Sequence, residues 1–127
     1  MTDVAEVEQA NARFYQAFET LDLARMELVW SHGEHVKCVH PGWPILVGWD
    51  AVRSSWESIF ENTAEMRFTL SDVRATACGD LAWVTCTENI LAEAGERISV
   101  TAILATNLFE RTDSGWRLIH HHASHVG

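Results

Sequence analysis

The chain has few basic residues and no long apolar run. It carries nine Lys and Arg against 18 Asp and Glu, a formal net charge of −9. Because nucleic acids and anionic membrane surfaces are bound by clustered basic side chains, neither is an expected partner. No apolar stretch approaches the roughly 20 residues of a membrane-spanning helix, and the first residues lack the basic and then apolar pattern of a signal peptide. We therefore expect a protein of the cytoplasm.

Cysteine and proline are also scarce. The three cysteines are odd in number and form no CxxC pair, which argues against a disulfide framework and against a structural zinc site. We expect Cys38, Cys78 and Cys86 to pack as small apolar residues on strands. Tryptophan, in contrast, is abundant, with six copies beside a single tyrosine. Several indole rings are therefore expected to line a cavity or a subunit interface.

The first half of the chain has the apolar spacing of helices. Helical periods run over residues 3–21, 23–30 and 48–61, and Asp22 is placed to cap the second helix. Between the second and third helices, residues 35–40 alternate as a strand that stops at a Pro-Gly pair.

The second half of the chain has the sequence pattern of β-strands only. Short turn signals separate four segments, so consecutive strands should pair antiparallel as hairpins. The segments are residues 66–77, 81–92, 97–111 and 116–126. Helices followed by a run of strands predict an α+β fold, in which helices pack on one face of a curved antiparallel sheet. The length of 127 residues predicts one domain, residues 1–127.

Four of the seven histidines lie in the last strand segment. Strict alternation places one set on one face and the remaining residues on the other. The first set is Trp116, Leu118, His120, His122 and Ser124; the second is Arg117, Ile119, His121, Ala123 and His125. We expect the first set to face a pocket and the second to face solvent or a subunit contact.

Three segments carry a family resemblance. Residues 105–111 (ATNLFER), 116–124 (WRLIHHHAS) and 46–50 (LVGWD) resemble SnoaL-like proteins and the association domain of calcium/calmodulin-dependent kinase II. Together with the order of elements, they make the chain similar to the nuclear transport factor 2-like superfamily, the cystatin-like α+β cone. The resemblance covers nearly the whole chain. It implies a single SnoaL-like domain, a strongly curved sheet around an internal pocket, and a homodimer formed through the convex sheet face.

Ketosteroid isomerase is a more distant relative in this superfamily. Members of that family use an Asp base directly before a Pro, a Tyr on the first helix and a protonated Asp on the penultimate strand, so the resemblance implies catalytic residues at these three positions. This sequence has His40, Phe14 and Asn107 at those positions, and Tyr15 would take the helix position if the alignment moved by one residue. Since no carboxylic acid remains to donate to an oxyanion, steroid isomerase activity is not expected.

The candidate site combines residues from several elements. A histidine with its unperturbed pKa of ~6.5 exchanges a proton at neutral pH, so His40 is a candidate base while His122 or Asn107 holds developing negative charge. Glu88 shares strand parity with apolar residues and is expected to point inward, and Trp43 lies in a turn-rich loop at the mouth. The predicted catalytic residues are His40, His120, His122 and Asn107; the predicted ligand-binding residues are Trp43, Glu88, Phe14, Tyr15, Phe109 and Ser124.

Several functions fit this pattern. One is a small-molecule-binding cone, acting as a cofactor-independent isomerase, lyase or hydrolase on an unknown substrate. A second is a non-catalytic association or ligand-sensing module, with Trp83, Leu104 and Leu108 on a dimer face. The histidines could also simply hydrogen-bond one another inside the fold. A zinc, nickel or iron set made of His120, His122, His40 and Glu88 is a further possibility, but motifs such as HExxH are absent, and the predicted site contains no metal.

Overall fold

The computed structural model describes residues 2–126 and shows an α+β fold. Met1 and Gly127, the two ends of the predicted domain, lie outside the described residues. The elements are α1 (Asp3–Glu19), α2 (Leu23–Val29), β1 (Lys37–Val39), β2 (Leu46–Val47), α3 (Trp49–Glu61), β3 (Glu65–Cys78), β4 (Leu81–Ala94), β5 (Arg97–Thr112) and β6 (Gly115–His125). The predicted helices and strands are confirmed, and the two-residue strand β2 is added to them. Among residues 2–126, no helix combines the length and the apolarity needed to cross a membrane.

The first two helices begin at polar caps. The Asp22 side chain accepts a hydrogen bond from the backbone N–H of Arg25 at 3.1 Å, as its position before an apolar stripe predicts. Thr2 caps α1 in the same way, accepting from the backbone N–H of Ala5 at 3.1 Å. These local bonds satisfy N–H groups that a helix start otherwise leaves without a partner.

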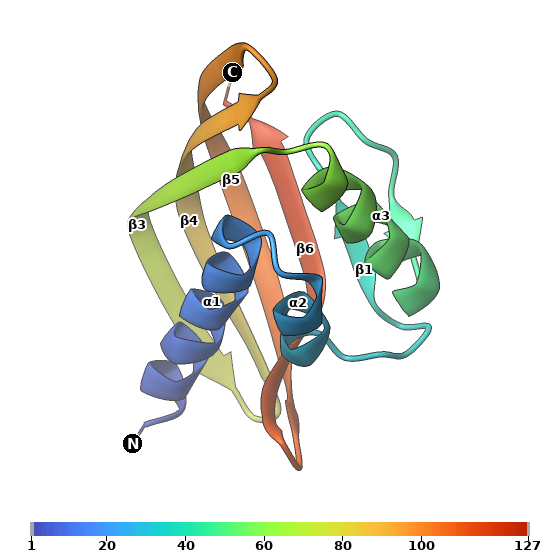
Figure 1. Cartoon of the computed structure of the whole chain (residues 1–127). Coiled ribbons are helices and arrows are strands. Elements are labelled where there is room, and N and C mark those ends of the chain that lie inside the picture. The colour runs from blue at the N-terminus through green and yellow to red at the C-terminus, as the bar shows by residue number, and fades with distance from the viewer. Residues whose placement is uncertain (1, 127) are drawn as a thin grey trace.

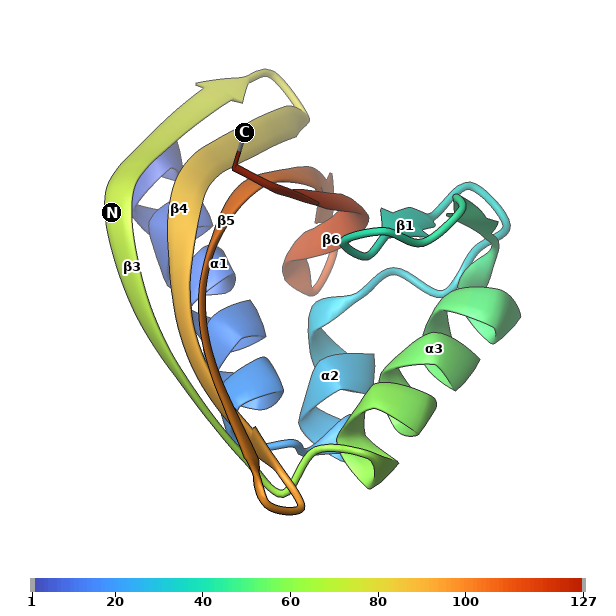
Figure 2. The same cartoon turned by 90° about the horizontal axis from the view of Figure 1, so that it is seen from above.

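The six strands form one sheet in the order β2-β1-β6-β5-β4-β3. Strands β3 to β6 pair antiparallel in succession, which confirms the predicted hairpins. β1 pairs parallel with β6 and antiparallel with β2, so it extends the sheet beyond the meander (Figure 1). The sheet curves strongly, and the three helices lie on its inner side (Figure 2).

Aromatic side chains from the helices fill much of this inner side. The Phe18 and Trp56 rings meet edge to face with centroids 4.7 Å apart, and Phe14 lies 5.7 Å from Trp56. Trp30, which directly follows α2, and Trp56 on α3 have no exposed surface. The apolar periodicity of the helices therefore becomes a packed aromatic core against the concave sheet.

A β-bulge interrupts the alternation of β6. Leu108 of β5 pairs with His120, but its neighbour Phe109 pairs with Leu118, so Ile119 is an extra residue in β6. Before the bulge, Trp116 and Leu118 are buried; after it, His121 and Ala123 are buried. Because strand side chains alternate with a period of two, one extra residue moves every following side chain to the opposite face. The predicted single alternation through residues 116–126 is therefore wrong in its second half.

Candidate functional site

Five buried polar side chains meet on the inner side of the sheet, and we call them the interior network: Asn11, Tyr15, Glu88, Asn107 and His121. The Tyr15 hydroxyl donates to Oε2 of Glu88 at 2.5 Å. The Asn107 amide donates to the Tyr15 oxygen at 3.1 Å and to Oδ1 of Asn11 at 2.9 Å. Oδ1 of Asn107 lies 2.5 Å from Nδ1 of His121. A continuous chain of hydrogen bonds thus connects α1, β4, β5 and β6.

Local geometry explains how these side chains reach one another. Asn11 and Tyr15 are four residues apart on α1 and so project from the same side of the helix. Glu88 shares its face of β4 with the buried Val84 and Cys86. The predicted inward orientation of Glu88 is confirmed, with 1% of its surface exposed.

Burial decides the charge of the network. It raises the pKa of Glu88 to about 7, although the hydrogen bond from Tyr15 opposes this shift. Burial, followed by the proximity of Glu88, raises the pKa of the Tyr15 hydroxyl well above its usual value. No Lys or Arg side chain forms an ion pair with Glu88 among residues 2–126. Glu88 is therefore a buried acid that exchanges a proton near neutral pH.

His40 occupies a neighbouring part of the interior. Its Nε2 lies 2.9 Å from Oγ of Ser55, whose hydroxyl donates to the Val52 carbonyl at 2.6 Å. Since Ser55 has a single proton to donate, Nε2 of His40 is the donor in this pair and Nδ1 is left as an acceptor. Burial lowers the pKa of His40 to about 4, so the ring is neutral at pH 7.

Trp43 connects this interior to the surface. Its ring packs edge-on against His40 with centroids 4.9 Å apart, and 41% of the residue is exposed. The His40 and His121 centroids are 6.4 Å apart. His40 therefore lies between the partly exposed Trp43 and His121 of the interior network.

The bulge removes three predicted residues from this interior. His120, His122 and Ser124 lie on the outer face of β6, and their predicted inward orientation is wrong. His122 and Ser124 border a hollow on the outer surface of the sheet. His121, predicted to face outward, is instead 1% exposed and belongs to the interior network. No local sequence signal marks the extra residue that causes this exchange.

The first helix presents Tyr15 to the site, not Phe14. The Tyr15 hydroxyl bonds both Glu88 and Asn107, whereas the Phe14 ring is a fully buried apolar neighbour of His121 at 5.0 Å. The position that the resemblance assigned to Phe14 is therefore corrected by one residue. Phe109, predicted to line the interior, is fully buried there.

Sequence reasoning missed Asn11 and Ser55. Each is a buried polar residue on an otherwise apolar helix side. Asn11 stands four residues before Tyr15, a spacing that could have indicated its role.

The metal set considered from the sequence is not formed. It requires His120 and His122 beside His40 and Glu88, but the first two lie on the opposite side of the sheet. In the described part of the chain, no group of three or more His, Cys, Asp or Glu side chains is arranged to hold a metal ion.

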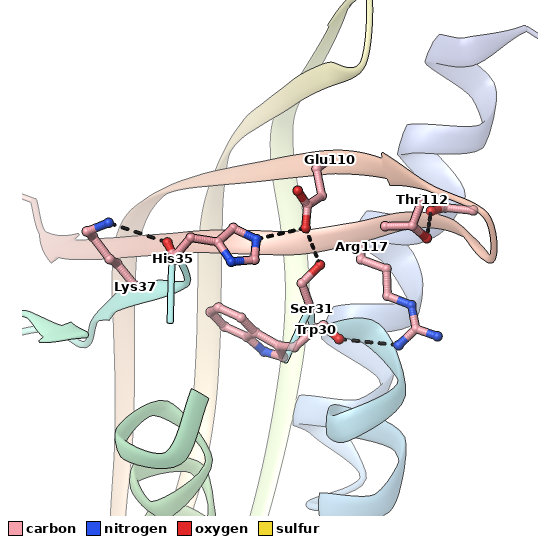
Figure 3. Close-up of polar contacts among 8 residues, drawn as sticks. Trp30, Ser31, His35, Lys37, Glu110, Thr112 and Arg117 are labelled. Carbon is pink, nitrogen blue, oxygen red and sulfur yellow. Dashed lines mark hydrogen bonds and ion pairs between the residues drawn. The ribbon is translucent and has the colours of Figure 1, made fainter. Parts of the chain in front are cut away.

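A second polar cluster lies outside the cone, around Glu110 (Figure 3). Oε2 of Glu110 accepts the Ser31 hydroxyl at 2.6 Å and lies 2.9 Å from Nε2 of His35. Partial burial alone would raise the pKa of Glu110, but the bonds to Ser31 and His35 outweigh it and lower that pKa. This outer cluster attaches the segment between α2 and β1 to the sheet.

The comparisons agree with this architecture. Residues 7–127 match the model of the SnoaL-like domain, so the chain belongs to the SnoaL-like domain family. The chain is 29% identical over 114 residues to the F-box protein SKIP8 of Arabidopsis thaliana, covering 90% of this chain and 47% of that protein. The chain thus spans about half the length of this curated relative.

Two solved structures are also similar. The first, from Streptomyces avermitilis, is a candidate dehydratase of the NTF2-like family; it is 42% identical, with a TM-score of 0.92 and coverage of 98% of this chain and 96% of that one. The second, from Thiobacillus denitrificans, is a candidate calcium/calmodulin-dependent protein kinase type II association domain; it is 35% identical, with a TM-score of 0.83 and coverage of 94% of both chains. The predicted superfamily and the cystatin-like cone are confirmed.

Proposed function

We propose that this protein binds a small molecule inside the cone and catalyses proton transfer on it, with Glu88 as the acid and base. The observation that carries this proposal is a carboxyl group with 1% exposure, a pKa near 7 and a fixed orientation. A catalytic acid or base works best when its pKa lies near the working pH. The 42% identical structure named as a candidate dehydratase supports chemistry of this kind.

The reaction class follows from the proton balance. Ionised Glu88 takes a proton from a carbon next to a carbonyl group, and the electron pair of that C–H bond moves toward the carbonyl oxygen. Protonated Glu88 then returns the proton. Delivery to another carbon gives an isomerisation, and delivery to a hydroxyl group on the adjacent carbon expels water. No cofactor takes part in either step.

Two of the predicted catalytic residues keep a place in this scheme, with altered roles. Both amide hydrogens of Asn107 are already donated to Asn11 and Tyr15, so Asn107 positions the network and does not hold an oxyanion. His40, neutral at pH 7, offers its Nδ1 as a second proton acceptor. The nature of the ligand stays a prediction, as do the cytoplasmic location and the lack of a nucleic-acid partner.

Access to the interior requires side chains to move. Phe14, Trp56 and Phe109 have no exposed surface, whereas Trp43 covers His40 and is partly exposed. A ligand would therefore enter by displacing Trp43, in agreement with its predicted role at the rim.

A base-catalysed elimination tests the proposal directly. In 5-nitrobenzisoxazole, removal of the C–H proton breaks the ring N–O bond and gives a coloured nitrile phenolate, so the reaction reports a buried carboxylate base. We expect turnover to rise with pH through about 7 and to fall by about 100-fold or more in Glu88→Gln. Glu110→Gln, which changes an outer carboxyl group, is the matched control and should retain turnover. Equal activity of Glu88→Gln and the unaltered protein would contradict the proposal.

A second candidate function, self-association, is supported by the outer sheet face. Cross-strand pairs Trp83 with Leu108 and Leu91 with Val100 lie on this face, and Trp83 is 40% exposed. The 35% identical structure is named as a candidate association domain. We propose a homodimer through this face, because exposed apolar patches commonly mark interfaces.

Sedimentation equilibrium at micromolar concentration tests the dimer. The unaltered protein should sediment as a dimer, and Trp83→Glu should be monomeric, because a carboxylate in an apolar interface loses its hydration. Glu88→Gln should remain dimeric, since Glu88 faces the interior. A monomeric unaltered protein would exclude this candidate function.

A further inference from the structure

The hydrogen bonds around Asn107 have a fixed direction. Its amide nitrogen can only donate, and it does so to Oδ1 of Asn11 and to the Tyr15 oxygen. The Tyr15 proton is directed to Glu88 at 2.5 Å, so the Tyr15 oxygen is free to accept. Reversing the Asn107 amide would set its oxygen against the Tyr15 oxygen, whose single proton is already directed to Glu88. Tyr15 therefore determines which end of the Asn107 amide faces His121, because the Asn11 amide can turn to serve either end.

This direction determines the state of His121. The atom that Asn107 presents to Nδ1 of His121, at 2.5 Å, is a carbonyl oxygen, which can only accept. Nδ1 must then carry a proton. Complete burial, together with the nearby His40, His120 and His122, lowers the pKa of His121 well below its usual value, so the ring has a single proton. Nε2 is consequently left as a bare acceptor.

His121 and its neighbour Trp56 each have a ring nitrogen without a hydrogen-bond partner among the described residues. Nε2 of His121 is one, since the only bond of this ring is made through Nδ1. The indole N–H of Trp56 is the other; it is buried and has no partner, as is also true of the indole N–H groups of Trp30 and Trp116. The centroids of the two rings are 5.9 Å apart. A hydroxyl group is the smallest organic group that satisfies both, because it accepts one hydrogen bond and donates another.

We infer that Tyr15 and Asn107 lock His121 in the Nδ1–H tautomer, and that its Nε2 accepts a hydrogen bond from a ligand hydroxyl group inside the cone. Tyr15 is then a positioning residue, acting on the ligand site through Asn107. The second half of this inference rests on the proposed function, since it requires a ligand in the interior. The first half concerns the protein alone.

Nitrogen-15 NMR of histidine-labelled protein tests the tautomer without a ligand. A His121→Gln variant identifies the resonances of His121. In the unaltered protein at about pH 7, Nδ1 of His121 should have the chemical shift of a protonated nitrogen and Nε2 that of a bare one. The reverse pattern would overturn the inference at once, whatever the ligand.

Variants of Tyr15 and Asn11 test the positioning role. Tyr15→Phe removes the oxygen that accepts from Asn107, so the Asn107 and Asn11 amides can turn together and the His121 resonances should shift toward the Nε2–H form. Adding Asn11→Asp, whose carboxylate only accepts, should restore the Nδ1–H form. If Tyr15→Phe retains the pattern of the unaltered protein, Tyr15 does not set the tautomer.

Phenol and anisole test the ligand half, because they differ by a hydroxyl donor that anisole lacks. Phenol should bind about tenfold more tightly than anisole, the equivalent of one good hydrogen bond, and should shift the Nε2 resonance of His121. Equal affinities would overturn the hydroxyl assignment. If neither probe binds, the proposal that the cone binds a ligand is contradicted. The NMR result on the His121 tautomer then shows separately whether the tautomer half of the inference still holds.

Discussion

Glu88 and Glu110 accept similar hydrogen bonds but carry opposite pKa shifts. Each carboxyl group accepts a hydrogen bond from a hydroxyl group: Glu88 from Tyr15 at 2.5 Å, and Glu110 from Ser31 at 2.6 Å. The pKa of Glu88 rises to about 7, while that of Glu110 falls below its usual value. Glu88 is shut off from water inside the cone, whereas Glu110 stays partly solvated beside His35.

The comparison shows that a short hydrogen bond does not by itself determine the charge of a carboxyl group. Desolvation penalises the ionised form of Glu88 more than one hydroxyl donor stabilises it. Glu110 receives two donors and loses less hydration, so its ionised form is favoured. The interior carboxyl group is therefore suited to moving a proton, and the outer one to holding a segment in place.

The largest expected effect comes from breaking the interior network at its centre. Asn107→Leu removes the partner of Asn11 and His121 and one partner of Tyr15, leaving buried polar groups without hydrogen bonds. We expect the free energy of unfolding to fall by about 3–5 kcal/mol. Ser31→Ala, the equivalent cut in the outer cluster, should cost about 1 kcal/mol, because water can replace the lost donor. Urea denaturation measures both, and equal losses would remove the distinction between the two regions.

The pH dependence of stability should change next most. Folding raises the pKa of Glu88 from 4.5 to about 7, so its contribution is fully present below pH 4.5 and is lost as the pH rises through 7. Glu88→Gln stays neutral and avoids this loss. Its stability relative to the unaltered protein should increase by about 2–3 kcal/mol between about pH 5 and about pH 8. A pH-independent difference in urea denaturation would show that Glu88 does not titrate in this range.

The smallest effect, of opposite sign, is expected at the outer cluster. The lowered pKa of Glu110 means that its contribution is present above the usual value of 4.5 and is lost as the pH falls through its folded value. Glu110→Gln should cost less than about 1 kcal/mol at about pH 7, and the difference should vanish in acid. Thermal unfolding across this range provides the measurement, and a loss that grew toward low pH would contradict the sign.

Local patterns predict the parts of the site that depend on a single element. The parity of β4 places Glu88 inside and Trp83 outside, and the parity of β5 places Asn107 and Phe109 inside. His40 is assigned to the interior by the resemblance, because it stands directly before a Pro as the base of ketosteroid isomerase does, and it is buried. These assignments hold because each depends on neighbours within a few residues.

The residues that sequence reasoning misplaced depend on contacts between distant elements. Tyr15, not Phe14, reaches Glu88 because of the way α1 docks on β4, 73 residues away in sequence. The pairing of Asn11 with Asn107 spans 96 residues. No periodicity within one segment contains this information.

The sequence by itself determined the helices, the strands and the hairpin order, because caps, apolar periods and turn residues act locally. The tertiary structure decided which histidine of the run 120–122 joins the interior network. The extra residue Ile119 in β6 is fixed by pairing with β5, and it turns His121 into the interior while His120 and His122 face outward. One residue changes the face of all that follow because a strand alternates with a period of two, so the composition of the site depended on register.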